Sequence, residues 1–327
     1  MKVNVLSERA YRRWPSFDVV FEWEDIIAPV LKAQIITFEG GLPGKVIRRL
    51  KKYWLKVNQR ANSKYRITNI TECKLLWEMA ANDYRTLPTK NIIPIFLDFP
   101  VSMVDPIIEA TSSLPVFFVT CKDIYNLLVQ KGVKKVRFMP LSISDKYFTE
   151  DVPDKTVDVI QFGRKNSVLH EYMLEYCEAH PTVDYVYQSG DGTLTYESTT
   201  RGNVGKFDTR KEYVDMIKPC RVSLVSTPGC DKGRSGEFGA IDFVTPRFFE
   251  SAAFYCHMIG RYTENEETEE LGLSTVCPNV KSYEVFEKLM DVYLGSLDWD
   301  WTVQREWTRR NLTSERAKYI QEEIGRL

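Results

Sequence analysis

Short apolar runs alternate with helical patterns along the first half of the chain. The runs that predict strands lie at residues 17–23, 33–38, 92–97, 114–119 and 135–139. Between the last two runs, residues 122–132 predict a helix that ends at a glycine. Alternating strands and helices are typical of a parallel sheet with helices on its faces. We therefore expect an α/β domain over residues 1–150.

The alternation begins again after residues 144–155, a polar and acidic segment that we interpret as a connection between domains. Beyond it, the patterns predict strands at 157–162, 183–187, 221–226 and 256–260, and helices at 167–179, 210–217, 246–254 and 283–294. Two Rossmann-like, doubly wound domains in tandem are the simplest arrangement, with the second domain over residues 151–298. Ligands of such sheets bind beyond the carboxyl ends of the strands, so two facing sheets create a cleft between them.

Composition narrows the class of protein. The 327 residues are 43% hydrophobic and 27% charged, as in soluble globular proteins. A formal net charge of −1 gives no overall field that would attract nucleic acid. The first residues form an apolar run too short, and too soon followed by charges, for a signal peptide. No run reaches the roughly 18 apolar residues of a membrane span. We expect a cytoplasmic protein, or one attached to the inner face of the membrane.

A glycine and two cations follow the predicted strand at 157–162. Gly163 would let the backbone approach a ligand, and Arg164 and Lys165 would neutralise a diphosphate. The alternative is an ordinary turn between a strand and a helix, with solvated charges. Ser226 and Thr227 end another strand, before a loop in which Gly233, Gly236 and Gly239 predict either a lid or a plain surface loop.

The predicted helix at 246–254 has a well-defined start. Thr245 is a good N-cap and Pro246 a good first residue. The amino end of a helix offers free amide groups and a partial positive charge to a phosphate. Arg247 opposes this dipole, which an anionic ligand would explain, and Glu250 is placed to accept both hydroxyls of a ribose. The alternative is a capped core helix whose Arg247 and Glu250 lie in water.

Three motifs occur together in this order: Phe-Gly-Arg at 162–164, Leu-Val-Ser-Thr-Pro-Gly at 224–229, and Thr-Pro-Arg-Phe-Phe-Glu-Ser-Ala at 245–252, before Gly260. Over about residues 157–294 the chain resembles bacterial family-1-type glycosyltransferases, in the branch of spore-maturation-like and capsule-biosynthesis enzymes. The resemblance implies a GT-B fold, with the nucleotide sugar bound by the second domain and the acceptor by the first. It also implies that residues 299–327 return to the first domain as a helix.

The same resemblance assigns roles to residues. The two family glutamates map onto Asp242 and Glu250, so that Glu250 would bind the ribose. Asp242 replaces the glutamate that contacts the donor sugar in retaining relatives, and its role stays open. Arg164 and Lys165 would counter the diphosphate, assisted by Thr245 and the helix start. Because such enzymes use side chains and a helix terminus for this purpose, we expect neither a metal nor another cofactor.

A catalytic base from the first domain has to be a carboxylate, because all three histidines lie in the second half. Glu39, Asp98 and Asp25 are the candidates, since the first two follow predicted strands. Such a residue is more often a structural acid of a turn than a base. A retaining enzyme needs no such base, so the stereochemistry stays open. The triplet Asp298-Trp299-Asp300 is similar to a metal-binding motif of another glycosyltransferase fold, but we interpret it as a packing segment.

Residues 45–66 carry nine cations, and no acid occurs from 40 to 71. On a helix, the apolar residues from Val46 to Val57 would share one face and the nearer cations the other. Such a helix is a candidate for contact with an anionic membrane or acceptor, or for docking on its own domain. The leading hypothesis is a transferase that adds sugar to a glycan or lipid-linked acceptor in the synthesis of bacterial surface polysaccharide, such as capsule or lipopolysaccharide. The alternatives are a sugar-nucleotide epimerase of the same fold and a non-enzymatic, two-lobed ligand-binding protein.

Overall fold

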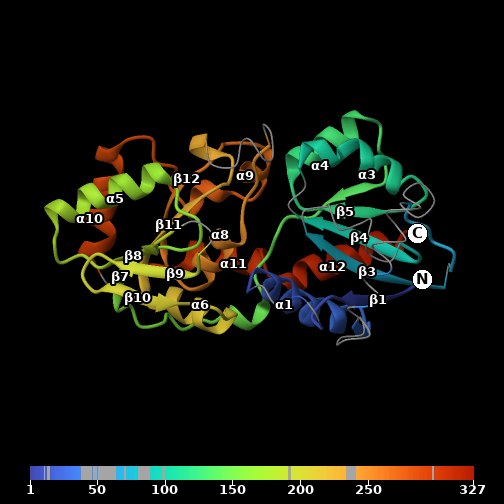
Figure 1. Ribbon diagram of the computed structural model, residues 1–327, viewed down its shortest axis with the longest axis horizontal. Helices are drawn as coiled ribbons and strands as arrows, with labels where there is room; N and C mark the ends of the chain where they lie inside the picture. Colours follow the sequence, from blue (N-terminus) through green and yellow to red (C-terminus); the bar gives the residue numbers. More distant parts are fainter. Residues whose placement is uncertain are drawn as a thin grey trace. The chain divides into compact units, whose positions relative to one another are not determined.

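The chain divides into two compact units in the computed structural model. The described residues are 1–10, 12, 15–37, 46, 50, 64–69, 71–79, 89–97, 100–190, 193–232, 241–296 and 298–327. Those of Met1–Ser144, Glu237–Ile241 and Thr313–Leu327 form the first unit, and those of Asp145–Gly236 and Asp242–Leu312 form the second. Each unit is a sheet with helices on its faces, which confirms the predicted α/β class (Figure 1).

The first unit is built on six parallel strands in the order β2-β1-β3-β4-β5-β6. The strands are β1 (Lys2–Ser7), β2 (Ile35–Thr37), β3 (Glu72–Met79), β4 (Ile92–Leu97), β5 (Phe117–Val119) and β6 (Val136–Phe138). The helices are α1 (Pro15–Val30), η1 (Val101–Met103), α3 (Val104–Ala110), α4 (Lys122–Gln130) and α12 (Thr313–Gly325). Helices α3 and α4 lie on one face of the sheet, and α1 and α12 on the other (Figure 1). The strand order reverses between β1 and β3.

Several elements of the first unit differ from the prediction, among them α1 and β3. The strand predicted at 17–23 is wrong, because these residues belong to α1. The buried residues of α1 are Val19, Val20, Glu22, Trp23, Glu24, Ile27 and Ala28, a spacing that places them on one side of a helix. Strand β3 was not predicted, because charged residues interrupt its apolar pattern. One of them, Glu78, is buried and accepts a hydrogen bond from Tyr65.

The second unit is built on six strands in the order β10-β9-β8-β7-β11-β12. They are β7 (Val157–Gln161), β8 (Tyr185–Gln188), β9 (Thr195–Ser198), β10 (Gly202–Lys206), β11 (Cys220–Ser226) and β12 (His257–Arg261). Strands β7, β8, β11 and β12 are parallel, and β9 and β10 extend the sheet as an antiparallel pair that was not predicted. The predicted helices at 167–179 and 210–217 are confirmed as α5 (Ser167–Ala179) and α6 (Arg210–Ile217).

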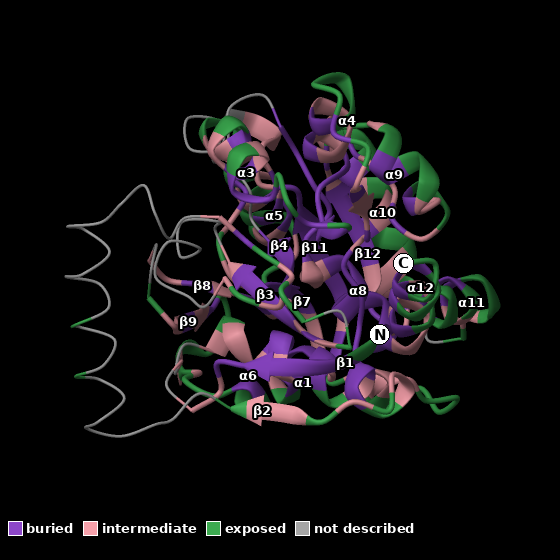
Figure 2. Ribbon diagram, turned by 90° about the vertical axis from the view of Figure 1, so that its right-hand side faces the viewer, coloured by how far each residue is buried: buried purple, intermediate pink, exposed green. Residues whose placement is uncertain are grey.

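The remaining elements of the second unit are η2 (Asp145–Tyr147), η3 (Cys230–Lys232), α8 (Pro246–Ala253), α9 (Glu266–Glu270), η4 (Leu273–Thr275), α10 (Tyr283–Gly295) and α11 (Thr302–Arg310). Side chains of α5 and α10 pack with β7, β11 and β12 in one core cluster. A second cluster joins α6 and the end of α8 to the strands through other side chains. The strands β7 and β11 are accordingly buried between layers of helices (Figure 2).

The predicted C-terminal segment, residues 299–327, is divided between the units. Helix α11 packs against α8 in the second unit, where the rings of Trp307 and Phe249 stack at 5.3 Å. Helix α12 packs against α1 in the first unit, where Glu323 forms an ion pair with Arg137. None of the described helices is both long enough and apolar enough to cross a membrane.

Candidate functional site

The strand order of the second sheet reverses between β7 and β11. The chain continues from β7 to β8 on one side, whereas β11 lies on the other side of β7. In open α/β sheets, the loops after two such strands diverge and leave a crevice at the carboxyl ends. The segments that follow these strands are residues 162–166 and 227–229, and both contain predicted site residues.

The turn after β7 depends on a glycine. Gly163 has a φ of +68°, in the left-handed region that other residues seldom adopt. Its amide donates a hydrogen bond of 2.9 Å to the hydroxyl of Tyr196. Three residues later, Asn166 caps α5, because its Oδ1 accepts a hydrogen bond of 2.9 Å from the amide of Leu169. The conformation of the turn is therefore fixed at both ends.

Helix α8 begins beside this turn. Arg247, in the first turn of α8, donates from Nη1 to the carbonyl oxygens of Arg164, at 2.9 Å, and Phe162, at 3.3 Å. A Cβ atom on Gly163 would lie 3.8 Å from the Arg247 side chain, so the two segments are in direct contact. Burial lowers the pKa of Arg247, but a guanidinium keeps its charge at neutral pH. The structure thus places a positive charge against the turn.

Two further cations belong to the turn itself. The side chain of Arg164 is exposed, and the ammonium of Lys165 lies 4.9 Å from the ring centre of Tyr187. Within the described part of the chain, neither side chain forms an ion pair with a carboxylate. Their charge is therefore available to an anionic ligand.

The N-cap of α8 carries an unusual hydroxyl. Thr245 has an extended backbone, but its side chain makes no capping hydrogen bond. The hydroxyl is buried and has no partner among the described residues, and the residue is only 8% exposed. Buried polar atoms without a partner are rare in native proteins and cost about 1–3 kcal/mol each. A ligand atom at the start of α8, next to Pro246, would satisfy this group.

The two acids of the predicted motif are both engaged within the protein. Glu250 is 2% exposed and accepts hydrogen bonds from Arg210 and Tyr213. Asp242 is 3% exposed and accepts hydrogen bonds from the Thr227 hydroxyl and, at 2.8 Å, from the Gly229 amide. Asp242 therefore fixes the loop that follows β11, and Glu250 presents no open face to a ribose in this structure.

Ser226 and Thr227 lie where β11 meets β12. Ser226 is paired with Arg261 at the ends of the two strands, and the Thr227 amide donates to the Arg261 carbonyl at 3.2 Å. Both residues are buried, at 6% and 3% exposure, so they present little surface to a ligand.

Sequence reasoning missed one cluster at this edge. Asp231 has a φ of 51° and receives two hydrogen bonds of 2.5 Å from the guanidinium of Arg261. It also accepts a hydrogen bond of 2.9 Å from the side chain of Asn166. The hydrogen bonds from Arg261 hold the pKa of Asp231 below its usual value. The cluster ties the turn after β7 to the segment after β11, and the only signal in the sequence was a charged residue near each strand end.

Several predicted residues lie outside the described part of the chain. They are Glu39, Asp98, Gly233, Gly236, Gly239 and most of the basic segment 45–66. Asp25 is described, and its carboxylate forms an ion pair of 2.8 Å with Arg9.

The carboxyl edge of the first sheet carries paired charges. Arg9, just after β1, donates to Glu24 at 3.0 Å and also contacts Ser7. Burial raises the pKa of Glu24 to about 7, against the opposing effects of Ser7 and Arg9. Arg12 forms an ion pair of 3.2 Å with Glu8. Each of these arginines therefore has a carboxylate partner within its own unit.

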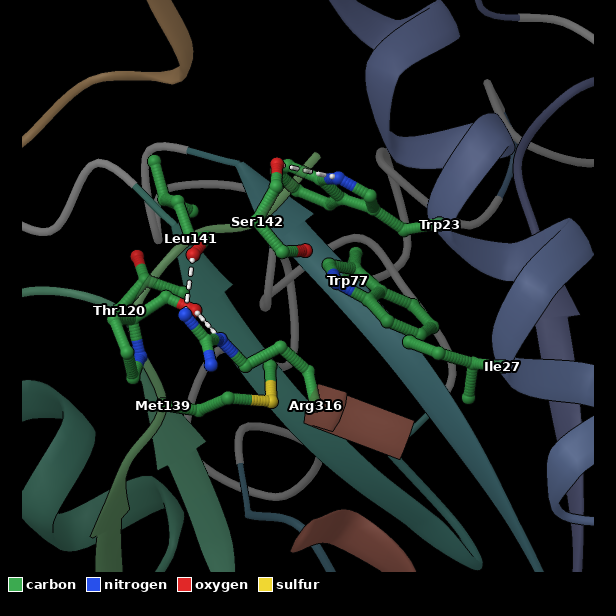
Figure 3. A pocket seen from close by; sticks show the side chains of 9 residues that line it. Trp23, Ile27, Trp77, Thr120, Met139, Leu141, Ser142 and Arg316 are labelled. Carbon is green, nitrogen blue, oxygen red and sulfur yellow. Dashed lines mark hydrogen bonds between the residues drawn. The ribbon is translucent and has the colours of Figure 1, made fainter. Parts of the chain in front are cut away.

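A small cavity lies near the same edge (Figure 3). Trp23 and Ile27 of α1, Trp77 of β3 and Thr120, just after β5, form part of its wall. The guanidinium of Arg316 reaches the remaining wall, where it donates to the carbonyls of Pro140 and Leu141 at 3.0 and 3.2 Å. With a volume of about 10 Å³, the cavity has room for about one water molecule.

Comparisons with known proteins bear on the fold. No protein-family model matches the chain, and no curated protein matches it. AviGT4, a glycosyltransferase involved in avilamycin A biosynthesis, is similar in structure, with a TM-score of 0.53 at 12% identity over 99% of this chain and 96% of that one. The likeness confirms the fold that the motifs implied, which is GT-B.

Two further likenesses are weaker. The pneumococcal O-GlcNAc transferase GtfA gives a TM-score of 0.48 at 9% identity, over 88% of this chain, which spans 60% of that protein's length. The UDP-GlcNAc 2-epimerase of Methanocaldococcus jannaschii gives 0.45 at 10% identity, over the whole of both chains. The likeness to AviGT4 concerns the fold alone, and the chemistry has to be argued from the residues.

Proposed function

We propose that the chain is a glycosyltransferase of the family-1 type that takes a sugar from a nucleoside diphosphate donor held by its second unit. The observation that carries the proposal is the contact of Arg247 with the carbonyls of Phe162 and Arg164. It joins the turn after β7 and the start of α8 into one cationic surface, at the place where the strand order reverses. A diphosphate is the group that such a surface suits best.

The chemistry follows from the charge of the leaving group. When the bond between the sugar carbon and the phosphate oxygen breaks, negative charge grows on the departing diphosphate. Arg164, Lys165 and the amides at the start of α8 would stabilise this charge, and such electrostatic stabilisation is commonly the largest contribution of a protein. In this proposal, side chains and a helix terminus supply the positive charge without a metal ion, and the Thr245 hydroxyl donates a further hydrogen bond to a phosphate oxygen.

The acids of the second unit then have supporting roles. Asp242 holds the loop after β11 through Thr227 and Gly229, and does not itself attack or deprotonate a substrate. A base for an inverting reaction would come from the first unit, where Glu39 and Asp98 stay predictions. The acceptor, a glycan or lipid-linked sugar of a surface polysaccharide, would bind to the first unit.

Contact with an anionic membrane is the second part of the proposal. Val46 and Leu50 belong to the predicted apolar face of the basic segment, and they are helical and 53% and 63% exposed. An exposed apolar pair beside lysines and arginines suits the interface of an anionic bilayer. Vesicles that contain phosphatidylglycerol should sediment the protein, and changing Arg48, Arg49, Lys51 and Lys52 to glutamine should abolish this. Equal sedimentation of the variant would contradict the membrane contact.

Turnover of a panel of nucleotide sugars tests the main proposal. With EDTA present and a mixture of bacterial glycolipids as acceptor, release of UDP or GDP should accompany the appearance of a glycosylated acceptor. NMR of the remaining donor separates the alternatives, because an epimerase would invert a sugar carbon without an acceptor. If the protein binds a donor but neither transfers nor epimerises the sugar, it is a binding protein and the proposed activity is wrong.

A further inference from the structure

Tyr196 of β9 contacts the turn after β7, although a third strand, β8, lies between the two strands in the sheet. Tyr187 of β8 pairs with Gln161, and the next residue of β8 pairs with Tyr196. Tyr196 is therefore level with Phe162, the first residue of the turn. Neighbouring strands lie about 4.8 Å apart, so its side chain has to cross β8. Its hydroxyl accepts a hydrogen bond of 2.9 Å from the Gly163 amide.

The ring of Tyr196 is fixed within the core. The residue is 1% exposed and belongs to the same core cluster as Phe162. Its ring packs edge to face on Phe207, with ring centres 5.2 Å apart. Burial raises the pKa of Tyr196, against the opposing effects of the Gly163 amide and of Arg247. The hydroxyl is therefore neutral at physiological pH, and the packed ring holds it at a fixed place beside the turn.

The backbone groups of the turn fall into two sets. The first set bonds to side chains: the Gly163 amide donates to Tyr196, and the carbonyls of the two flanking residues accept from Arg247. The second set is the amides of Arg164 and Lys165, which donate to no protein group within the described part of the chain. Successive amides after a residue in the left-handed region form a concave surface that suits an anion. Gly163 is thus committed to the protein, whereas the two amides that follow it are not.

We propose that Tyr196 is a positioning residue of the donor site, which holds Gly163 in the left-handed conformation and thereby orients Arg164 and Lys165 toward the diphosphate. This inference rests on the proposed function, because it concerns the same site. Without the hydroxyl, the Gly163 amide would lose its acceptor, and the turn could change conformation to find another. Tyr196 therefore acts through the glycine and does not itself touch the ligand.

Calorimetric titration of UDP, GDP and inorganic pyrophosphate into the full chain tests this role. Tyr196→Phe keeps the ring in the core and removes only the hydroxyl, so the variant should fold. It should bind pyrophosphate about tenfold more weakly than the wild-type protein, because the turn loses its fixed conformation. Whichever nucleotide the wild-type protein binds should be weakened by the same factor, since the loss concerns the diphosphate and not the nucleoside. A loss for the nucleotide alone would contradict the proposal.

Tyr176→Phe is the matched control. Tyr176 is also buried in the second unit, at 3% exposure, and its hydroxyl donates a hydrogen bond of 2.8 Å to Asp291. The control should lose stability in urea, because it loses this hydrogen bond, and should keep its affinity for every probe. If Tyr196→Phe loses stability in the same way but binds the probes as tightly as the wild-type protein, Tyr196 serves the fold alone and the inference is wrong.

A second variant separates action through the glycine from direct contact with the ligand. Gly163→Ala disfavours the φ of +68°, while its Cβ would make only an ordinary contact of 3.8 Å with Arg247. It should weaken pyrophosphate by about tenfold, and adding Tyr196→Phe should weaken it less than about twofold further, because both changes release the same turn. Independent losses that reach about 100-fold in the double variant would show that Tyr196 contacts the phosphate itself. That result would overturn the positioning role.

The outcomes also separate this inference from the proposed function. If the wild-type protein binds neither a nucleotide nor pyrophosphate, the proposed function fails. If it binds them and Tyr196→Phe binds them equally well, only the positioning role of Tyr196 fails. Should Tyr196→Phe not fold, Gly163→Ala alone decides, because unchanged affinity in that variant would mean that the conformation of the turn does not govern binding.

Discussion

The carboxyl edges of the two sheets differ in the partners of their arginines. In the first unit, Arg9 contacts the carboxylates of Glu24 and Asp25, and Arg12 contacts Glu8. In the second unit, Arg164 and Lys165 follow a strand in the same way, but no carboxylate pairs with either of them among the residues that the structure describes. The same architecture therefore produces a neutralised edge and a cationic edge. The position of carboxylates, and not the fold, selects the unit that we expect to bind an anion.

The two units also respond to pH in opposite directions. Burial raises the pKa of Glu24 in the first unit to about 7, so its contribution to stability is present at low pH and is lost as pH rises. Burial lowers the pKa of His257 in the second unit to about 3, with Lys155 and Arg221 as smaller causes. The stability that neutral His257 contributes is present at pH values above the ordinary histidine pKa, and it is lost as pH falls. Acid should therefore weaken the second unit through His257.

Removing the arginine of the neutralised edge should have the largest effect on folding. Arg9→Met leaves the buried Glu24 without its cation, and we expect a loss of about 2–3 kcal/mol in the free energy of unfolding. Affinity for UDP or GDP should not change, because the edge binds no anion. Urea unfolding and calorimetry measure the two quantities. A weaker nucleotide affinity in a folded Arg9→Met protein would place the anion site, at least in part, on the first unit.

Replacing His257, at the opposite end of the second sheet, should have a smaller effect on stability, and this effect should depend on pH. His257 stacks on Tyr293 with ring centres 4.3 Å apart, and Trp299 and Trp301 lie within 4.5 Å. His257→Phe keeps the ring but removes the titration. Between pH 7 and pH 4.5, the wild-type protein should lose about 2 kcal/mol more stability than the variant. Parallel losses in both proteins, measured by denaturant unfolding, would mean that His257 is solvated and titrates normally.

Replacing Thr245, at the start of α8, should have the smallest effect of these substitutions. Thr245→Val removes the unpartnered buried hydroxyl, so the free energy of unfolding should rise by about 1 kcal/mol, while UDP affinity should fall by about 1 kcal/mol, or roughly fivefold. Thr209→Val is the matched control, since Thr209 caps α6 through a hydrogen bond from Glu212. The control should lose about 1 kcal/mol of stability and keep its affinity. Unchanged affinity in Thr245→Val would show that no ligand reaches this hydroxyl.

Local signals in the sequence predicted most of the fold. Helices α5 and α6 were predicted at their observed bounds from the pattern of apolar and polar residues, and the structure shows that each begins at a capping residue, Asn166 and Thr209. Helix α1 was misread because a window of seven residues is too short to separate the helical period from alternation. Strand β3 was missed because its buried Glu78 finds a partner, Tyr65, only in the folded chain.

The site was predictable only in part, because some of its side chains also find their partners only in the folded chain. A glycine before two cations and a capped helix start are local patterns, and the structure brings Arg247 to the turn that contains Arg164. The partners of the acids are distant in sequence. Glu250 meets Arg210 forty residues away, and Asp231 meets Arg261 thirty residues away. No local pattern distinguishes a glutamate that awaits a ribose from one that already holds an arginine.

The cationic edge is tested most directly by titrating UDP and GDP into the double variant Arg164→Gln/Lys165→Gln. The control is Lys206→Gln/Lys211→Gln, which removes the same charge from exposed lysines that pair with Asp208 and Asp215. We expect the first variant to bind at least one nucleotide about 100-fold more weakly than the wild-type protein, and the control to bind it equally well. Equal affinity in all three proteins would contradict a diphosphate site at this turn.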